Sequence, residues 1–136
     1  MKIGATLETQ GETCKLGDMF LASLPRPLRL ALYAVATAIL LAMCLVPQED
    51  LPSAPMGDKI EHSVAWFVLT ITGLLLSHHR PRAIAAFAIG LGAAVEVLQA
   101  TMESGRHGDW RDLLADFLGV LAALALYALI ERLRRA

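Results

Sequence analysis

The segment from Gly105 to Gly119 reads GRHGDWRDLLADFLG, and it decides how the rest of the chain is interpreted. It begins as a short charged turn and continues as an apolar helix that still carries carboxylates. Asp112 and Asp116 are four residues apart, so they share one face of that helix. Asp116 falls inside an apolar block that resembles a membrane span, where an ionisable side chain is costly and marks a functional site by default. We therefore expect other helices to supply partners for these acids.

The composition is typical of a membrane protein. Of the 136 residues, 56% are hydrophobic and only 18% are charged, with a formal net charge of −1. The apolar residues form four long blocks separated by short polar connections, which is the pattern of membrane-spanning helices. The sequence therefore predicts an all-α membrane protein with four transmembrane helices in an antiparallel bundle, at Leu28–Val46, Asp58–Ser77, Ala83–Met102 and Arg111–Ile130.

Three parts are expected along the chain. Residues 1–27 are predicted to be a cytoplasmic N-terminal tail that lacks the pattern of a cleaved signal peptide. A short interfacial helix before Pro25 and a disordered tail both fit its sequence. Residues 28–131 form the predicted membrane domain, and residues 132–136 a basic cytoplasmic C-terminus. Cys14 and Cys44 show neither a disulfide framework nor a metal-binding spacing.

The distribution of basic residues predicts the orientation, because cytoplasmic loops are enriched in Lys and Arg. The two termini and the second loop carry Lys2, Lys15, Arg26, Arg29, Arg80, Arg82, Arg132, Arg134 and Arg135. The other side carries Lys59, Arg106 and Arg111. Both termini are therefore expected in the cytoplasm, and the chain is expected in the bacterial cytoplasmic membrane as a multi-pass protein.

With that topology, the unusual polar residues fall at a similar depth near the outer surface. His62 lies about 6 Å below Asp58, and Glu96 about 9 Å before the end of its span, at 1.5 Å per helical residue. Spacings of three or four residues place these side chains on shared helix faces. The sequence predicts one functional pocket formed by Asp58, Lys59, His62, Glu96, Gln99, Arg106, Asp112 and Asp116.

Structural roles compete with this interpretation at several positions. Asp58 and Asp109 stand where N-caps of the second and fourth spans are expected. Lys59 and Arg111 fit snorkelling side chains at a membrane surface.

Further residues have equally simple structural explanations. Glu96 fits a buried structural pair with Arg106 or His62. Trp66 and Trp110 are better explained as packing residues or interfacial anchors than as platforms for a ligand.

Taken together, the motifs resemble those of the VanZ-like family of small bacterial membrane proteins. They are Asp58-Lys59-x-x-His62, Glu96-x-x-Gln99, then Arg106, Asp112, Asp116 and Gly119. The resemblance covers about Asp58 to Leu124 and leaves out the N-terminal tail. The family often has Asn where this chain has Asp116, so the resemblance does not imply a charge at that position.

The resemblance implies a protein of the cell envelope, without naming a reaction. The family's namesake is linked to low-level resistance to the glycopeptide teicoplanin, and relatives accompany exopolysaccharide and envelope genes. The first hypothesis is therefore a protein that binds or modulates a cell-wall, lipid-linked or exopolysaccharide intermediate. In that hypothesis, Lys59, Arg106 and two helix N-termini contact a phosphate or carboxylate.

Two other functions remain open. A membrane enzyme would use Glu96, Asp112, Asp116 and His62 in acid/base chemistry on a lipid-linked phosphate or glycan, or as ligands of a divalent metal. No nucleophile motif stands out, and no cofactor is predicted. A subunit of an ion-coupled or envelope complex would need a homo-oligomer or a partner protein. Membrane lipids are expected partners, and nucleic acid is not.

Overall fold

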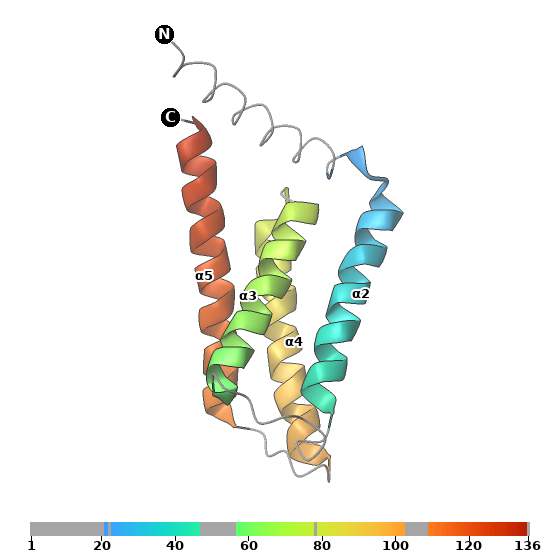
Figure 1. The fold of residues 1–136 in the computed structure, drawn as a ribbon, viewed down its shortest axis with the longest axis vertical. Coiled ribbons are helices and arrows are strands. Elements are labelled where there is room, and N and C mark those ends of the chain that lie inside the picture. Colours follow the sequence, from blue (N-terminus) through green and yellow to red (C-terminus); the bar gives the residue numbers. More distant parts are fainter. Residues whose placement is uncertain (1–20, 22, 47–56, 78, 103–108, 136) are drawn as a thin grey trace, which may run out of the picture.

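The computed structural model describes residues 21, 23–46, 57–77, 79–102 and 109–135, in which four long helices form a bundle (Figure 1). The helices are α2 (Arg26–Leu45), α3 (Asp58–Leu76), α4 (Pro81–Thr101) and α5 (Trp110–Arg135). Successive helices run in opposite directions, so α2 begins and α5 ends at the same end of the bundle. Each is long and apolar enough to cross a membrane. The predicted four-helix membrane fold is confirmed, while the membrane side on which each end lies stays a prediction.

Proline, glycine and aspartate mark where the helices begin. Pro25 precedes α2, and Pro81 is the first residue of α4, a position that tolerates the missing N–H. Gly57 precedes α3 with a φ of 82°, a left-handed conformation that favours glycine. Asp109 precedes α5, and its Oδ1 accepts a hydrogen bond of 2.9 Å from the Arg111 N–H. The N-cap predicted at Asp109 is therefore present.

The helix ends differ slightly from the sequence prediction. Helix α5 continues through Arg135, beyond the predicted end at Ile130. The Glu131 carboxylate lies 3.8 Å from Arg134 Nη1 and 3.6 Å from Arg135 Nη2. Ion pairs between residues three and four positions apart stabilise one more helical turn. The three arginines in this last turn also interact favourably with the helix dipole. Good helix formers thus extend the helix beyond its apolar block.

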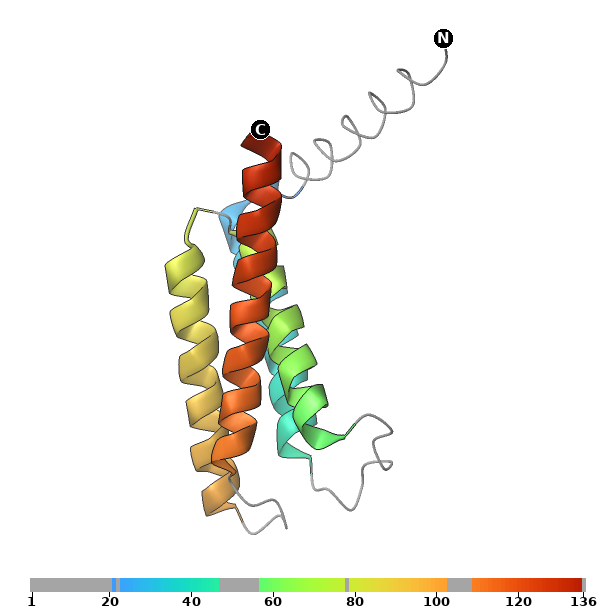
Figure 2. The same ribbon diagram turned by 90° about the vertical axis from the view of Figure 1, so that its left-hand side faces the viewer.

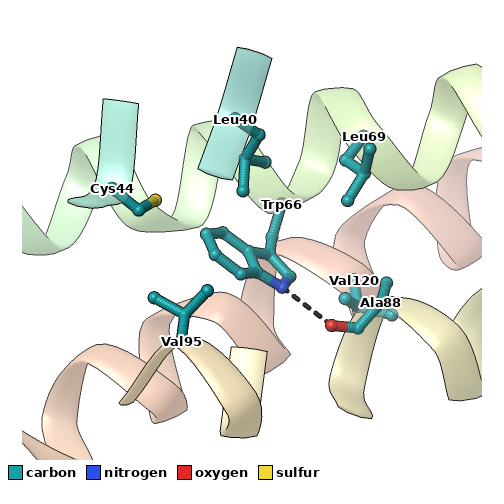
Figure 3. Close-up of a cluster of buried hydrophobic side chains, with 7 residues drawn as sticks. All are labelled: Leu40, Cys44, Trp66, Leu69, Ala88, Val95 and Val120. Atoms are coloured by element: carbon teal, nitrogen blue, oxygen red, sulfur yellow. Dashed lines mark hydrogen bonds between the residues drawn. The ribbon is translucent and has the colours of Figure 1, made fainter. Parts of the chain in front are cut away.

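Trp66 of α3 lies at the centre of the core. Its side chain has no exposed surface, and its Nε1–H donates a 2.9 Å hydrogen bond to the Ala88 carbonyl oxygen of α4. Side chains from all four helices surround the indole, and Figure 3 shows Leu40, Cys44, Leu69, Val95 and Val120 among them. The tryptophan therefore has the packing role predicted for it, with its polar atom satisfied inside the bundle.

The helices share the core unequally. Helix α5 lies beside both α3 and α4 (Figure 2), and its most extensive contact is with α3. Helix α2 is more peripheral, and large apolar side chains such as Leu30, Ile39 and Met43 are more than half exposed. It is connected to α3 by Arg29, whose Nη1 donates to the Leu76 carbonyl oxygen over 3.0 Å. Exposed apolar surface of this kind suits a helix in contact with lipid.

Candidate functional site

Most of the predicted site residues that the structure describes gather at one end of the bundle. We call this the polar end: α3 and α5 begin there, and α2 and α4 end there (Figure 1). The polar cluster consists of Lys59, His62, Glu96, Gln99, Asp109, Asp112 and Asp116. Five of these side chains are buried, namely His62, Glu96, Gln99, Asp112 and Asp116. Buried polar groups need partners, and the helices supply most of them.

Lys59 connects the start of α3 to the start of α5. Its Nζ lies 2.6 Å from Asp112 Oδ1 and 3.0 Å from Asp109 Oδ2. Asp112 is buried, whereas Lys59 and Asp109 are exposed at the rim. The Arg111 N–H, followed by the Lys59 ammonium, holds the pKa of Asp109 below its usual value of 3.8. Lys59 therefore forms structural ion pairs, a role beyond the snorkelling and ligand binding that the sequence predicted for it.

Deeper in the bundle, His62 of α3 is paired with Asp116 of α5. The Nδ1 of His62 lies 3.0 Å from Asp116 Oδ1, and the two side chains are 6% and 1% exposed. The imidazole also stacks on Trp66, with ring centroids 5.9 Å apart and planes inclined by 11°. A carboxylate on one ring nitrogen and an indole against one face fix the orientation of this imidazole.

Glu96 of α4 reaches the start of α5. Its Oε2 accepts a 2.8 Å hydrogen bond from the backbone N–H of Asp109. The sequence predicted Arg106 or His62 as a structural partner of Glu96. Arg106 lies outside the described residues, and the hydrogen bond that the structure shows comes from a backbone group. The second oxygen, Oε1, is buried and has no hydrogen-bond partner among the described residues. Glu96 therefore has one anchored oxygen and one available oxygen.

Gln99 connects α4 to the end of α2. Its Nε2 donates a 2.9 Å hydrogen bond to the Cys44 carbonyl oxygen, one of the last carbonyls of α2. Such carbonyls have no partner inside their own helix, so a side-chain amide is a natural one. Gln99 is 3% exposed and closes the cluster on the side of α2. The contact gives it a structural role at the edge of the site.

Three buried side chains have the spacing of a possible metal site. His62, Glu96 and Asp116 each offer one ligand atom, and these atoms lie within 4.8 Å of one another. Asp116 Oδ2, like Glu96 Oε1, has no hydrogen-bond partner in the described parts of the chain. The arrangement brings together one imidazole and two carboxylates from three different helices.

The two remaining predicted site residues, Asp58 and Arg106, lie partly or wholly outside the described part of the chain. Asp58 is the first residue of α3, and Gly57 rather than Asp58 occupies the cap position; the Asp58 side chain lies outside the description. Arg106 lies outside the described residues altogether.

Sequence reasoning missed three contributors to the cluster. Asp109 was expected only as a cap, yet it also binds Lys59 and donates its N–H to Glu96. Trp66 was assigned to packing, yet it stacks on His62. Gly92 lies one turn before Glu96, and a β-carbon there would lie 3.0 Å from Asp116 Oδ2.

A surface groove of about 800 Å³ lies at the opposite end of the bundle. The start of α4 and the last turns of α5 line it, with Pro81, Tyr127 and Arg132 among the lining residues. None of its lining residues belongs to the polar cluster. The groove therefore has no part in the candidate site.

The VanZ/LLP1 family model matches residues 46–131, which is more than half of the chain. The chain belongs to the VanZ/LLP1 family. No curated protein and no solved structure gives a significant match.

The VanZ/LLP1 match has a clear structural meaning. It covers α3, α4 and most of α5, and it begins just after α2 ends. All the ionisable side chains of the polar cluster come from the matched region, and α2 contributes the Cys44 carbonyl. Family membership and four membrane-length helices identify a multi-pass membrane protein.

Proposed function

We propose that this VanZ/LLP1 protein acts in the bacterial cell envelope and binds a lipid-linked, cell-wall or exopolysaccharide intermediate at its polar end. In this proposal it lies in the cytoplasmic membrane with the polar end facing outward, as the distribution of Lys and Arg predicts. The observation that carries the proposal is a pair of buried carboxylate oxygens, Glu96 Oε1 and Asp116 Oδ2, without partners among the described residues.

Buried carboxylate oxygens favour a ligand that donates hydrogen bonds. An unpaired charged acceptor in a bundle is unfavourable, and a hydroxyl or amine group that binds there relieves that cost. Glycan intermediates carry many hydroxyl groups, and a lipid-linked glycan places them close to the membrane surface. Glu96 and Asp116 offer oxygens within 4.8 Å of each other, so a sugar that enters between α4 and α5 contacts both.

Lys59 supports an anionic portion of the same ligand. An ammonium group has three donors, and Asp109 and Asp112 accept two of them. Among the described residues the third donor has no partner, so it can bind a phosphate or carboxylate. Because two carboxylates already balance its charge, Lys59 contributes less to anion binding than an isolated lysine would. Arg106, predicted from the sequence as a second anion contact, completes the proposed site.

A binding measurement tests this proposal. The full chain is placed in lipid nanodiscs and titrated with a polyprenyl-diphosphate-linked saccharide. We expect Glu96→Gln and Arg106→Ala each to weaken affinity by about tenfold or more, the scale of a lost hydrogen bond to a charged group. Glu131→Gln, a matched change at the opposite end of α5, should leave affinity unaltered. Wild-type affinity in Arg106→Ala and Glu96→Gln would exclude this function.

A membrane enzyme is the second candidate, and the His62–Asp116 pair is the observation that favours it. A carboxylate that orients an imidazole is the arrangement used in general acid/base catalysis, and Glu96 lies close enough to act as a second acid or base. The substrate would be a lipid-linked phosphate or glycan.

Turnover measurements distinguish the two functions. For an enzyme, we expect purified protein to release phosphate or saccharide from the lipid-linked substrate. Glu96→Gln combined with Asp116→Asn should abolish this release, whereas Glu131→Gln should not. Turnover that survives the double substitution would remove the enzymatic hypothesis. Binding without any turnover would favour the first function.

A further inference from the structure

We propose that His62, Glu96 and Asp116 form a binding site for one divalent transition-metal ion inside the helix bundle. The three side chains come from α3, α4 and α5, and all three are at least nine-tenths buried. Each offers one ligand atom, and the three atoms lie within 4.8 Å of one another. The ion would use the same two carboxylate oxygens as the ligand proposed above, but its binding is tested without that ligand.

The available carboxylate oxygens point to an ion rather than to a purely structural cluster. Glu96 Oε1 and Asp116 Oδ2 are buried and have no hydrogen-bond partner in the described parts of the chain. The other oxygen of each residue is anchored, by the Asp109 N–H and by His62 Nδ1 respectively. The anchoring leaves each side chain with one oxygen for a cation. Lys59 does not supply that charge, because its ammonium contacts the carboxylates of Asp109 and Asp112 instead.

Gly92 shows where the available oxygen of Asp116 is directed. A β-carbon added at Gly92 would lie 3.0 Å from Asp116 Oδ2, so this oxygen faces the surface of α4 at that glycine. Glu96 follows Gly92 by four residues and therefore lies on the same face of α4, one turn further along. The two carboxylates thus converge on the space between α4 and α5, beside the His62 imidazole.

The geometry requires only a small adjustment. Ligand atoms about 2.1 Å from a tetrahedral ion lie about 3.4 Å from one another, so the three atoms must approach by at most about 1.4 Å. Small changes of side-chain torsion in Glu96 and Asp116 supply such a movement. An ion bound through Nδ1 of His62 replaces the present hydrogen bond between Nδ1 and Asp116 Oδ1.

The donor set also indicates the class of ion. One imidazole nitrogen with two carboxylate oxygens suits Mn²⁺, Fe²⁺ or Zn²⁺, whereas the absence of a thiolate among the three disfavours Cu⁺. Three protein ligands leave at least one coordination position for water or for a ligand oxygen, as in open rather than closed metal sites.

Equilibrium metal binding provides the first test. The full chain is purified in detergent, stripped with a chelator and dialysed against Mn²⁺ or Zn²⁺, and bound ion is counted by elemental analysis. We expect one ion per chain. Glu96→Gln and Asp116→Asn should each weaken binding by about 100-fold or more, because each removes a charged ligand. The matched substitutions Glu131→Gln and His79→Gln, at the opposite end of the bundle, should not change it.

A spectroscopic measurement on the unaltered chain keeps the test decisive if a variant fails to fold. Pulsed electron paramagnetic resonance of bound Mn²⁺ should show coupling to a single imidazole nitrogen. Failure to retain an ion, a bound ion without nitrogen coupling, or full affinity in a folded Glu96→Gln variant would each overturn the site. A chain that binds the saccharide but no metal ion would retain the proposed function and reject only the metal site.

Discussion

Gly119 of α5 lies directly against the backbone of Ser63 of α3. A β-carbon at Gly119 would overlap the Ser63 carbonyl oxygen and would lie 3.0 Å from the Phe67 nitrogen. His62 precedes Ser63, and Asp116 lies one turn before Gly119, so this close contact sets the register that pairs His62 with Asp116. The small residue that lets the two helices approach thus also positions the site.

The first prediction concerns this helix contact. Gly119→Ala should destabilise the bundle by about 1–3 kcal/mol, because α3 and α5 must separate to accommodate the methyl group. Gly90→Ala is the matched control: a β-carbon there has no neighbour within 4 Å, and alanine favours a helix over glycine. Thermal unfolding in detergent measures the stability of both variants. A Gly119→Ala variant as stable as Gly90→Ala would show that the close approach is not needed.

The second prediction concerns the His62–Asp116 pair. A double-mutant cycle with His62→Ala and Asp116→Ala should give a coupling free energy of about 1–2 kcal/mol, towards the upper end for polar pairs between membrane helices. Denaturant unfolding of the four proteins supplies the values. Strict additivity of the two substitutions would mean that the 3.0 Å contact contributes nothing to stability.

The third prediction concerns the connection between α2 and α4. Gln99→Leu preserves much of the side-chain volume but removes the donor to the Cys44 carbonyl oxygen, so we expect a loss of about 0.5–1.5 kcal/mol. Thr101→Val removes an exposed hydroxyl whose hydrogen bonds, among the described residues, lie within its own helix, and it should cost less. Unfolding of both variants in one detergent makes the comparison. Equal loss of stability in the two variants would mean that the hydrogen bond from Gln99 to the Cys44 carbonyl oxygen contributes no more than a bond within one helix.

Four long apolar blocks were enough to predict the four spans, and the helical rise per residue placed the unusual polar residues at a similar depth. The bundle follows because each predicted helix is long, apolar and bounded by polar residues. The partners within the site were not predictable in the same way. Glu96 binds a backbone N–H and Gln99 a backbone carbonyl, and such groups exist at every residue. Their availability depends on where helices end relative to one another, which sequence spacing does not specify.

The partners of Lys59 and the last residue of α5 were also not predicted from the sequence. The sequence allowed Lys59 to snorkel or to bind an anion, because it did not specify the distance between the starts of α3 and α5. Once these starts are adjacent, Asp109 and Asp112 are its nearest partners. Helix α5 extends past its apolar block because Glu131 and the basic residues after it are also good helix formers.

The last prediction concerns the pH dependence of stability at the rim of the site. The Arg111 N–H and the Lys59 ammonium lower the pKa of Asp109 in the folded chain below 3.8, its value when exposed to solvent. Because the folded state binds the proton less readily, ionised Asp109 stabilises the fold above pH 3.8, and this contribution is lost as pH falls through the folded pKa.

Asp109→Asn isolates this contribution, because the amide can still accept from the Arg111 N–H but carries no charge to pair with Lys59. We expect the wild-type chain to unfold at a higher temperature than the variant near neutral pH. The difference should shrink as the pH is lowered from about 6 to about 2.5. Thermal unfolding of both proteins across that range measures it. A difference that stays constant at low pH would contradict an ion pair between Lys59 and Asp109, and would leave Asp112 as the only carboxylate described in contact with that lysine.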